Sequence, residues 1–280
     1  MISVRKSGFF TTLQDAGRFG YRHLGVPVSG VMDRYAARRA NSLLENQKGD
    51  ALLEITMTGP ELEFHEPTYI ALAGADMSAK LNGESIGINE VHEIEPGDIL
   101  SFGQLKKGLR VYLAIKGGFQ TASILNSRSF YKPITEMNRI REHMELPYTP
   151  CDSYVPKIMQ VKPDTFWKRN QLQVYPGPEF DLLDDKQLEG LFVRSFTIAK
   201  ENNRMAYQLE EHLSPNIHSM LTSATLPGTV QLTPAGKIII LMVDGQTTGG
   251  YPRILQLSEG SINLLAQKKH GDKIEFVIQK

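Results

Sequence analysis

The chain has 280 residues, of which 31 are Lys or Arg and 31 are Asp or Glu, so its formal net charge is zero. This length suffices for one large or two modest domains, and the balanced charge argues against a nucleic-acid-binding protein with a basic surface. The longest aliphatic run, residues 238–243, is far shorter than the roughly twenty residues that cross a membrane. The first residues lack a secretion signal, and the single Cys151 fits a reducing compartment, so we expect a cytoplasmic protein that binds no membrane.

Hydrophobic residues along the chain mostly alternate with a period of two, which predicts short strands. The clearest strand patterns cover residues 99–102, 109–115, 172–175 and 273–278. A helix is predicted over 34–44, where Ala36 and Ala40 share one face and Asp33 occupies the N-cap position. A second helix is predicted over 180–191. The chain is therefore expected to be mainly β with a few helices.

Three stretches of the N-terminal half reappear in the same order in the C-terminal half. The strand at Val4 before the first helix corresponds to the strand at Val174 before the second, the stretch from Gly59 to Asp76 matches the one from Gly228 to Asp244, and residues 97–102 match residues 271–276. A period of this length is too long for a solenoid, so it indicates two related β domains that arose by internal duplication.

The repeat predicts the domain boundaries. We expect a first β domain over residues 1–125, a connector over 126–169 and a second β domain over 170–280. Only the first copy has a long loop between its first strand and first helix, from Thr11 to Asp33, where the second copy has Pro176–Pro178. A loop of this length in a compact domain is usually functional or disordered, and its apolar residues argue against disorder.

Several sequence motifs that would identify a reaction are missing. The sequence has no phosphate-binding loop, no dinucleotide-binding turn, no zincin helix, no nucleophile elbow and no biotin attachment site. The seven histidines are scattered, so no metal site is predicted. Polar residues on glycine-rich loops remain as the candidates for chemistry.

The first candidate loop carries Gln14, Asp15 and Arg18. A carboxylate and a guanidinium stand three residues apart there, with a glycine between them. This pattern is typical either of a catalytic pair or of a salt bridge that fixes the loop. Asp76 and Arg128 are weaker candidates, Asp76 because it takes the repeat-equivalent place of Asp244.

The second candidate loop runs from Asp244 to Pro252 and directly follows the most apolar strand pattern of the chain. Its amide, hydroxyl and backbone N–H groups suit a carboxylate, amide or phosphate ligand, whereas a simple hairpin would need only two residues. The residues that we expect to form a site here are Asp244, Gln246, Thr247, Gly249, Gly250 and Tyr251.

These loops resemble a known family, which includes the C subunit of ATP-dependent 5-oxoprolinase, KipA, allophanate hydrolase subunit 2 and the carboxyltransferase domain of urea carboxylase. The matching segments lie between residues 12 and 252, and the longest are 12–33 and 244–252. The resemblance implies two tandem cyclophilin-like β-barrel domains. The chain departs from the family pattern at 125–130, at 132–149 and at 204–206, which leaves the substrate open.

The resemblance implies a subunit of an ATP-dependent 5-oxoprolinase-type amide hydrolase. Its partners would be a KipI-like protein and a LamB/YcsF-like protein as the other two subunits, its substrate a small amide or lactam, and ATP would act in the assembled complex. Asp15, Arg18 and Asp244 would be catalytic, with Asp15 orienting or deprotonating and Arg18 facing phosphate charge. The substrate-binding residues would be Gln14, Asp76, Arg128, Gln246, Thr247, Gly249, Gly250 and Tyr251.

Two alternatives stay open. The chain could instead be a biotin-dependent carboxyltransferase subunit that receives carboxybiotin from another protein. It could also be a non-enzymatic, KipA-like antagonist of a KipI-type kinase inhibitor.

Overall fold

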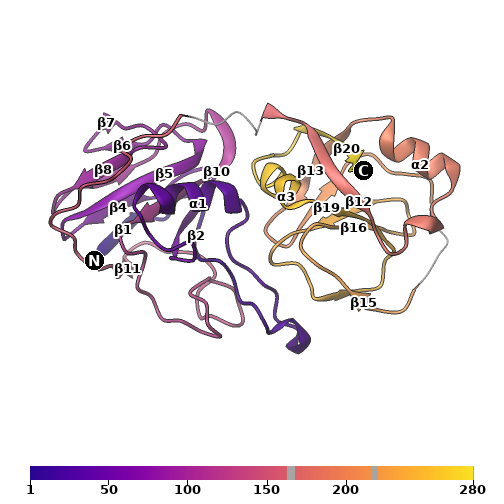
Figure 1. The fold of residues 1–280 in the computed structure, drawn as a ribbon, viewed down its shortest axis with the longest axis horizontal. Helices are drawn as coiled ribbons and strands as arrows, with labels where there is room; N and C mark the ends of the chain where they lie inside the picture. The colour runs from indigo at the N-terminus through magenta and orange to yellow at the C-terminus, as the bar shows by residue number, and fades with distance from the viewer. Residues whose placement is uncertain (163–167, 216–219, 280) are drawn as a thin grey trace. The chain divides into compact units, whose positions relative to one another are not determined.

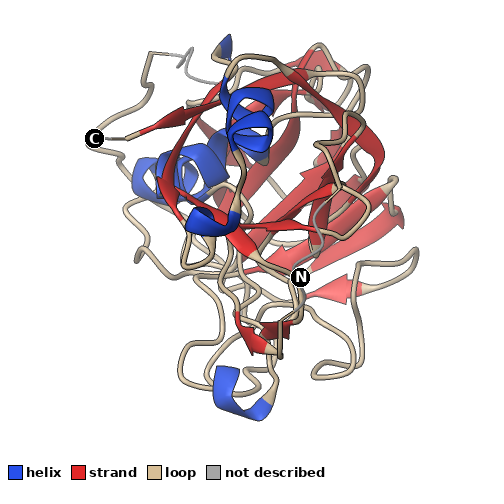
Figure 2. Ribbon diagram, turned by 90° about the vertical axis from the view of Figure 1, so that its right-hand side faces the viewer, coloured by secondary structure: helices blue, strands red, loops and turns tan. Residues whose placement is uncertain are grey.

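The computed structural model describes residues 1–162, 168–215 and 220–279. Strands and loops make up most of these residues, and the α-helices among them are α1 (Arg34–Leu43), α2 (Asp185–Phe192) and α3 (Glu259–Leu265) (Figure 2). The described chain divides into two compact units. The first contains residues 1–18 and 29–162, and the second contains residues 19–28 and 168–279.

The strands of the first unit form two antiparallel sheets. The five-stranded sheet has the order β2-β3-β10-β5-β8, with β2 (Phe10–Gln14), β3 (Leu52–Thr56), β10 (Lys107–Ile115), β5 (Thr68–Asp76) and β8 (Val91–Ile94). The six-stranded sheet has the order β11-β1-β4-β9-β6-β7, with β11 (Glu145–Leu146), β1 (Ile2–Lys6), β4 (Glu61–Phe64), β9 (Ile99–Ser101), β6 (Lys80–Leu81) and β7 (Glu84–Ser85).

One apolar core joins these two sheets. It contains Ile2 and Phe64 of the six-stranded sheet together with Leu53 and Leu113 of the five-stranded sheet, all fully buried. Two sheets that bury alternate side chains against each other leave one face of each exposed to another partner.

Helix α1 covers the other face of the five-stranded sheet (Figure 1). Its alanines, among them Ala36 and Ala40, pack on Ala71 of β5 and Tyr112 of β10. The Asp33 side chain accepts a hydrogen bond of 3.0 Å from the Ala36 amide, which satisfies one of the free N–H groups at the helix start. The helix predicted from the sequence over 34–44 is therefore confirmed, cap included.

The second unit is a closed barrel of seven strands in the order β12-β19-β16-β17-β14-β13-β20. Parallel pairing of β12 with β20 closes it, and the remaining pairs are antiparallel. The strands are β12 (Gln171–Pro176), β13 (Phe196–Asn202), β14 (Ala206–Leu209), β16 (Thr229–Leu232), β17 (Ile238–Leu241), β19 (Arg253–Leu257) and β20 (Lys273–Ile278). A separate ribbon pairs β15 (Ser223–Ala224) with β18 (Thr248–Gly249).

The mainly β architecture expected from the sequence is confirmed, and so is a barrel in the second unit. In the first unit, the described strands form two sheets instead of a closed barrel. The helix expected over 180–191 is interrupted and consists of the short 3-10 helix η3 (Phe180–Leu182) followed by α2. Asp184 causes the break, because it accepts a hydrogen bond of 2.7 Å from the Gln187 amide and forms a capping box that starts α2.

Residues 126–162, the described part of the expected connector, pack on the first unit. The Phe130 amide donates to Leu13 O, the Ile140 amide donates to Thr11 O, and β11 pairs with β1. The described part of the expected connector, up to residue 162, thus contributes backbone pairing to the first unit. Residues 163–167 of that connector, and residues 216–219 and 280 of the expected second domain, lie outside the described residues.

Within the ranges that the structure describes, no helix is long and apolar enough to cross a membrane.

Candidate functional site

The long N-terminal loop begins later than its sequence indicates, because Thr11–Gln14 belong to β2. Its two ends meet: the Val31 amide donates to Asp15 O over 3.1 Å. Gly30 has a positive φ of 77°, and a Cβ there would come within 2.9 Å of the Ala16 backbone, so only glycine fits this approach. Residues 19–28, which we call the arm, form part of the second unit.

Asp15 accepts four hydrogen bonds within the first unit. Its carboxylate receives the hydroxyls of Ser127 and Ser129, each at 2.7 Å, and the backbone amides of Arg128 at 2.6 Å and Gly17 at 2.8 Å. Both carboxylate oxygens take part. Asp15 thus fastens the turn 127–129 to the base of the loop, in the manner of a carboxylate that binds several N–H and O–H groups.

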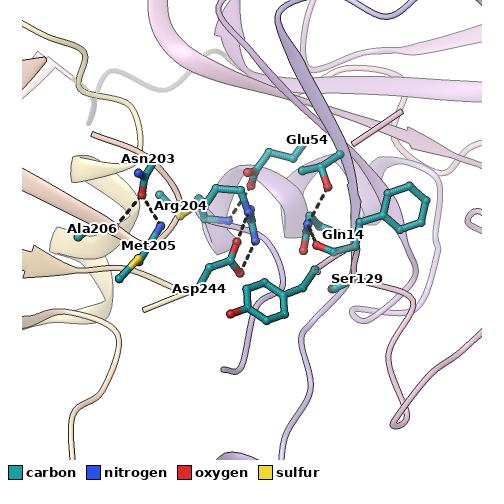
Figure 3. Close-up of polar contacts among 12 residues, drawn as sticks. Gln14, Glu54, Ser129, Asn203, Arg204, Met205, Ala206 and Asp244 are labelled. Atoms are coloured by element: carbon teal, nitrogen blue, oxygen red, sulfur yellow. Dashed lines mark hydrogen bonds and ion pairs between the residues drawn. The ribbon is translucent and has the colours of Figure 1, made fainter. Parts of the chain in front are cut away.

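Three other predicted residues join this cluster. The Gln14 amide donates to Thr12 Oγ1 at 3.0 Å and to Phe130 O at 3.1 Å (Figure 3). Arg18 is fully buried and donates to the carbonyl oxygens of Ile124 and Ser129. The backbone of Arg128 binds Asp15, while its guanidinium donates to Gln120 Oε1 at 3.2 Å. Gln14, Asp15, Arg18 and Arg128 therefore lie together.

Asp76 does not lie with them. Gln14 on β2 pairs with Leu52 on β3, which lies opposite Ala114 on β10 because Leu53 pairs with Leu113. Ala114 in turn pairs with Ala71 on β5, five residues before Asp76. At about 3.3 Å per residue, Asp76 therefore lies roughly 16 Å along the strand direction from the level of Gln14. It accepts a hydrogen bond from the Ser78 amide in the following turn.

A buried polar network, which the sequence did not single out, supports the other end of the loop. Glu54 Oε2 receives the Met32 amide at 2.7 Å and the Tyr112 hydroxyl at 3.0 Å, and Glu54 Oε1 lies 3.7 Å from Arg110 Nε. Burial, together with the charge of Glu54, raises the pKa of Tyr112 well above its usual value. In the sequence, the only indication that Glu54 is buried was the alternation along β3, which places it on the same face as Leu52.

In the second unit, Asp244 forms a two-point ion pair with Arg204. Arg204 Nε lies 2.8 Å from Asp244 Oδ2, and Arg204 Nη2 lies 3.2 Å from Asp244 Oδ1 (Figure 3). The Asp244 amide also donates to Arg204 O. Both side chains are about nine-tenths buried, with exposures of 7% and 12%. The pair ties the start of the second candidate loop to the segment before β14.

The rest of this loop is held by residues 223–225 and by β16. The Thr225 amide donates to Thr247 O at 3.0 Å, and the Thr225 hydroxyl donates to Gln246 O. Buried Gln231 donates to Tyr251 O at 3.4 Å, and a Cβ on Gly249 would come within 2.5 Å of Gln231 Nε2. The loop is therefore a fixed structure and not a bare hairpin. The flanking Gly250 and the 42%-exposed Tyr251 lie at its outer end.

Arg22 of the arm also binds this loop. It opens the short 3-10 helix η1 (Arg22–Leu24), which ends at Gly25 with a left-handed φ of 79°. Its Nη2 donates to Thr225 O and, at 3.4 Å, to Thr247 O. Burial lowers the pKa of Arg22. Val26 and Val28, which follow in the arm, are buried. The sequence pointed to Arg18 as a candidate in the N-terminal loop and gave no indication that Arg22 binds the second candidate loop.

Across residues 1–162, 168–215 and 220–279, no three His, Cys, Asp or Glu side chains are grouped so that they could hold an ion.

Residues 24–278 match the family model described as "Carboxyltransferase domain, subdomain A and B". The chain belongs to the carboxyltransferase-domain family. It is 31% identical to the C subunit of 5-oxoprolinase from Escherichia coli (strain K12), covering 99% of this chain and 91% of that protein. The family resemblance inferred from the loop motifs is thereby confirmed.

Two other proteins match this chain over only part of their own length. Urea amidolyase of Lachancea kluyveri is 29% identical, covering 99% of this chain and 17% of that protein. The crystal structure of TTHA0988 superposes with a TM-score of 0.90 at 27% identity, covering 99% of this chain and 56% of that one. The chain thus spans about half of that solved chain.

Proposed function

We propose that this chain is a subunit of an ATP-dependent 5-oxoprolinase-type hydrolase, which opens 5-oxoproline to glutamate. The observation that carries the proposal is reciprocal coverage. This chain and the C subunit of 5-oxoprolinase match over 99% and 91% of their lengths, whereas the match occupies only 17% of urea amidolyase. The match thus extends over nearly all of the C subunit, which favours the role of that protein for this chain.

The chemistry of the two candidate carboxylates supports a shared active site. A lactam is a poor electrophile, and ATP would supply phosphoryl activation of the amide oxygen. Asp15 and Asp244 each use both oxygens to bind residues of this chain, so neither fits as a ligand for a magnesium nucleotide. No step through ATP is therefore assigned to this chain, and we expect its partners, a KipI-like protein and a LamB/YcsF-like protein, to bind the nucleotide in the cytoplasm.

Within this chain we propose a division of labour between the two loops. Asp15 orients the turn 127–129 and acts together with Gln14, Arg18 and Arg128. Asp244 fixes the start of the second loop through Arg204, and that loop contacts the substrate through residues 246–251. Asp76 lies outside both clusters and is not included.

A second candidate function is carboxyl transfer from carboxybiotin carried by another protein. It is favoured by the family model and by the similarity to urea amidolyase. The same loops would then receive the carboxyl group and its acceptor.

Reconstitution tests these functions directly. The chain is mixed with the purified KipI-like and LamB/YcsF-like proteins from its own source, and glutamate formation from 5-oxoproline is measured with and without ATP. We expect turnover only when all three proteins and ATP are present. Full turnover without this chain would contradict the proposal. Transfer from carboxybiotin without 5-oxoproline turnover would favour the second candidate. A stable complex with the KipI-like protein but no reaction of either kind would favour the KipA-like antagonist.

A further inference from the structure

Arg22 is a partly buried cation in the second unit with no carboxylate partner among the described residues. Its hydrogen bonds run from Nη2 to two backbone carbonyls, Thr225 O and Thr247 O. Burying a guanidinium costs free energy unless an anion pairs with it. Carbonyl oxygens compensate part of that cost but leave the net charge unmatched.

Two other arginines of the same unit are paired with carboxylates. Arg204 binds Asp244 at two points, and Arg253 binds both oxygens of Glu179, at 2.9 and 2.7 Å. Arg253 also donates to Ala224 O, one residue away from the carbonyl that Arg22 binds. Two arginines therefore hold the same short segment, but only one of them has its charge neutralised. Support of the segment alone does not explain the unmatched charge on Arg22.

The guanidinium of Arg22 has donors left over. Neither Nε nor Nη1 makes a hydrogen bond to any residue within the described ranges. Because Nη2 binds Thr247 O, these donors lie beside the loop that carries Gln246 and Thr247. A carboxylate of a bound molecule would match both the charge and the hydrogen-bonding capacity of this side chain.

Gln246 supplies an independent sign of a ligand. Its Oε1 atom is buried and has no hydrogen-bond partner in the part of the chain that the structure describes. A buried acceptor of this kind is normally satisfied, because leaving it without a donor is unfavourable. A small molecule with an N–H group next to a carboxylate would satisfy Gln246 and Arg22 together, and a lactam with an adjacent carboxylate has this arrangement.

We propose that Arg22 binds the substrate carboxylate and that Gln246 Oε1 accepts the lactam N–H, so that the arm completes the substrate site of the second unit. This inference rests on the proposed function, since it specifies which groups of 5-oxoproline the site recognises. It refines the expectation that Gln246 and Thr247 bind the substrate, because it assigns the carboxylate to Arg22. The loop keeps its binding role, and the arm provides the positive charge.

Ligand titrations with the isolated full chain test the assignment without partners or ATP. Dissociation constants are measured by ligand-observed NMR for three probes. 5-Oxoproline carries both groups, 2-pyrrolidinone has the lactam without the carboxylate, and tetrahydrofuran-2-carboxylate has the carboxylate without the lactam. The variants are Arg22→Met and Gln246→Met, and Arg253→Met is the matched control because it also removes an arginine from the 223–225 segment.

We expect Arg22→Met to weaken 5-oxoproline and tetrahydrofuran-2-carboxylate by about 10- to 100-fold while changing 2-pyrrolidinone by less than about 2-fold. Gln246→Met should weaken the two lactams and spare tetrahydrofuran-2-carboxylate. Arg253→Met should leave the preference among the three probes as in the wild type. Near-equal binding of 5-oxoproline and 2-pyrrolidinone by the wild-type chain would overturn the proposal, and so would equal losses in the Arg22 and Arg253 variants for every probe.

The two proposals fail separately. Carboxylate-selective binding that depends on Arg22, in a chain that supports no 5-oxoproline turnover with its partners, would overturn the proposed function and leave the binding site standing. Turnover that is unaffected by Arg22→Met would overturn the binding assignment alone.

Discussion

At the scale of single residues, the two carboxylates with the strongest sequence case both serve as connectors. Asp15 gathers four donors from two segments of the first unit, and Asp244 holds one guanidinium in the second. In both cases the acidic side chain fixes a loop that carries other functional candidates. Changes at these positions should therefore alter structure as well as activity, and two experiments separate these effects.

The first experiment replaces Asp244 by Asn. The substitution removes the charge that binds the nearly buried Arg204 at two points, so we expect a loss of about 2 kcal/mol in the free energy of unfolding. Glu63→Gln is the control, because its ion pair with Arg5 is exposed to solvent and should contribute much less to stability. Denaturant titration measures both. An unchanged stability of Asp244→Asn with abolished activity would instead identify Asp244 as catalytic.

The second experiment replaces Asp15 by Asn. Asparagine presents an NH2 group where one oxygen now accepts a hydrogen bond, and that group would oppose the Arg128 amide or a serine hydroxyl. We expect faster amide hydrogen exchange across residues 127–130 and a loss of about 1–2 kcal/mol. Ser127→Ala removes only one of the four hydrogen bonds and should have a smaller effect. Wild-type exchange combined with lost activity would speak for a direct chemical role of Asp15.

At the scale of elements, the arm is the middle part of the long N-terminal loop. It belongs to the second unit, although the loop begins and ends in the first unit. The chain leaves β2, contributes residues 19–28 to the second unit, and returns to α1. The hydrogen bond between Val31 and Asp15 closes the loop that contains the arm, and Val26 and Val28 near the end of the arm are buried. The arm thus belongs to the first candidate loop in sequence and supports the second candidate loop through Arg22.

Replacing residues 19–28 with a short Gly-Ser linker tests this role. Because the loop ends already meet at Val31 and Asp15, we expect the first unit to keep its hydrogen-exchange protection. Residues 223–225 and 246–249 should lose protection, since Arg22 no longer donates to Thr225 O and Thr247 O. Equal protection of the second loop with and without the arm would contradict the assignment.

The ion pair between Glu179 and Arg253 gives an element-scale prediction for pH. Hydrogen bonds from Arg253 lower the pKa of Glu179 below its usual value of 4.5, which means that the folded state favours the charged carboxylate. This contribution to stability is complete above the unfolded pKa and is lost as the pH falls through the lower folded pKa. Glu179→Gln should therefore be less stable than the wild type by about 1 kcal/mol near pH 7, and the difference should shrink as the pH falls below 4.5 and through the lower folded pKa. A difference that persists unchanged in acid would show that charge is not its cause.

At the scale of the whole molecule, the sequence supported predictions that depend on local patterns. The N-cap Asp33 and the alanine face predicted α1, and alternating patterns located β9, β10, β12 and β20. Long-range packing was not predictable, because nothing local reveals that the segment 19–28 joins the second unit or that Glu54 meets Arg110 and Tyr112. For the same reason, the sequence predicted a candidate site in the loop at Asp244 but did not indicate that Arg22 binds this loop. Tandem duplication remains an interpretation of the repeated motifs.

The central claim is that this chain contributes substrate recognition to a 5-oxoprolinase-type complex through Arg22 and the loop that it binds. The most direct test is the rate of glutamate formation in the mixture of all three proteins, measured over a range of 5-oxoproline concentrations for the wild type and for Arg22→Met. We predict ATP-dependent turnover with the wild-type chain and a KM for 5-oxoproline raised at least about 10-fold in the variant, with the KM for ATP unchanged. No turnover with the wild-type chain, or the same KM for 5-oxoproline in both proteins, would contradict the account.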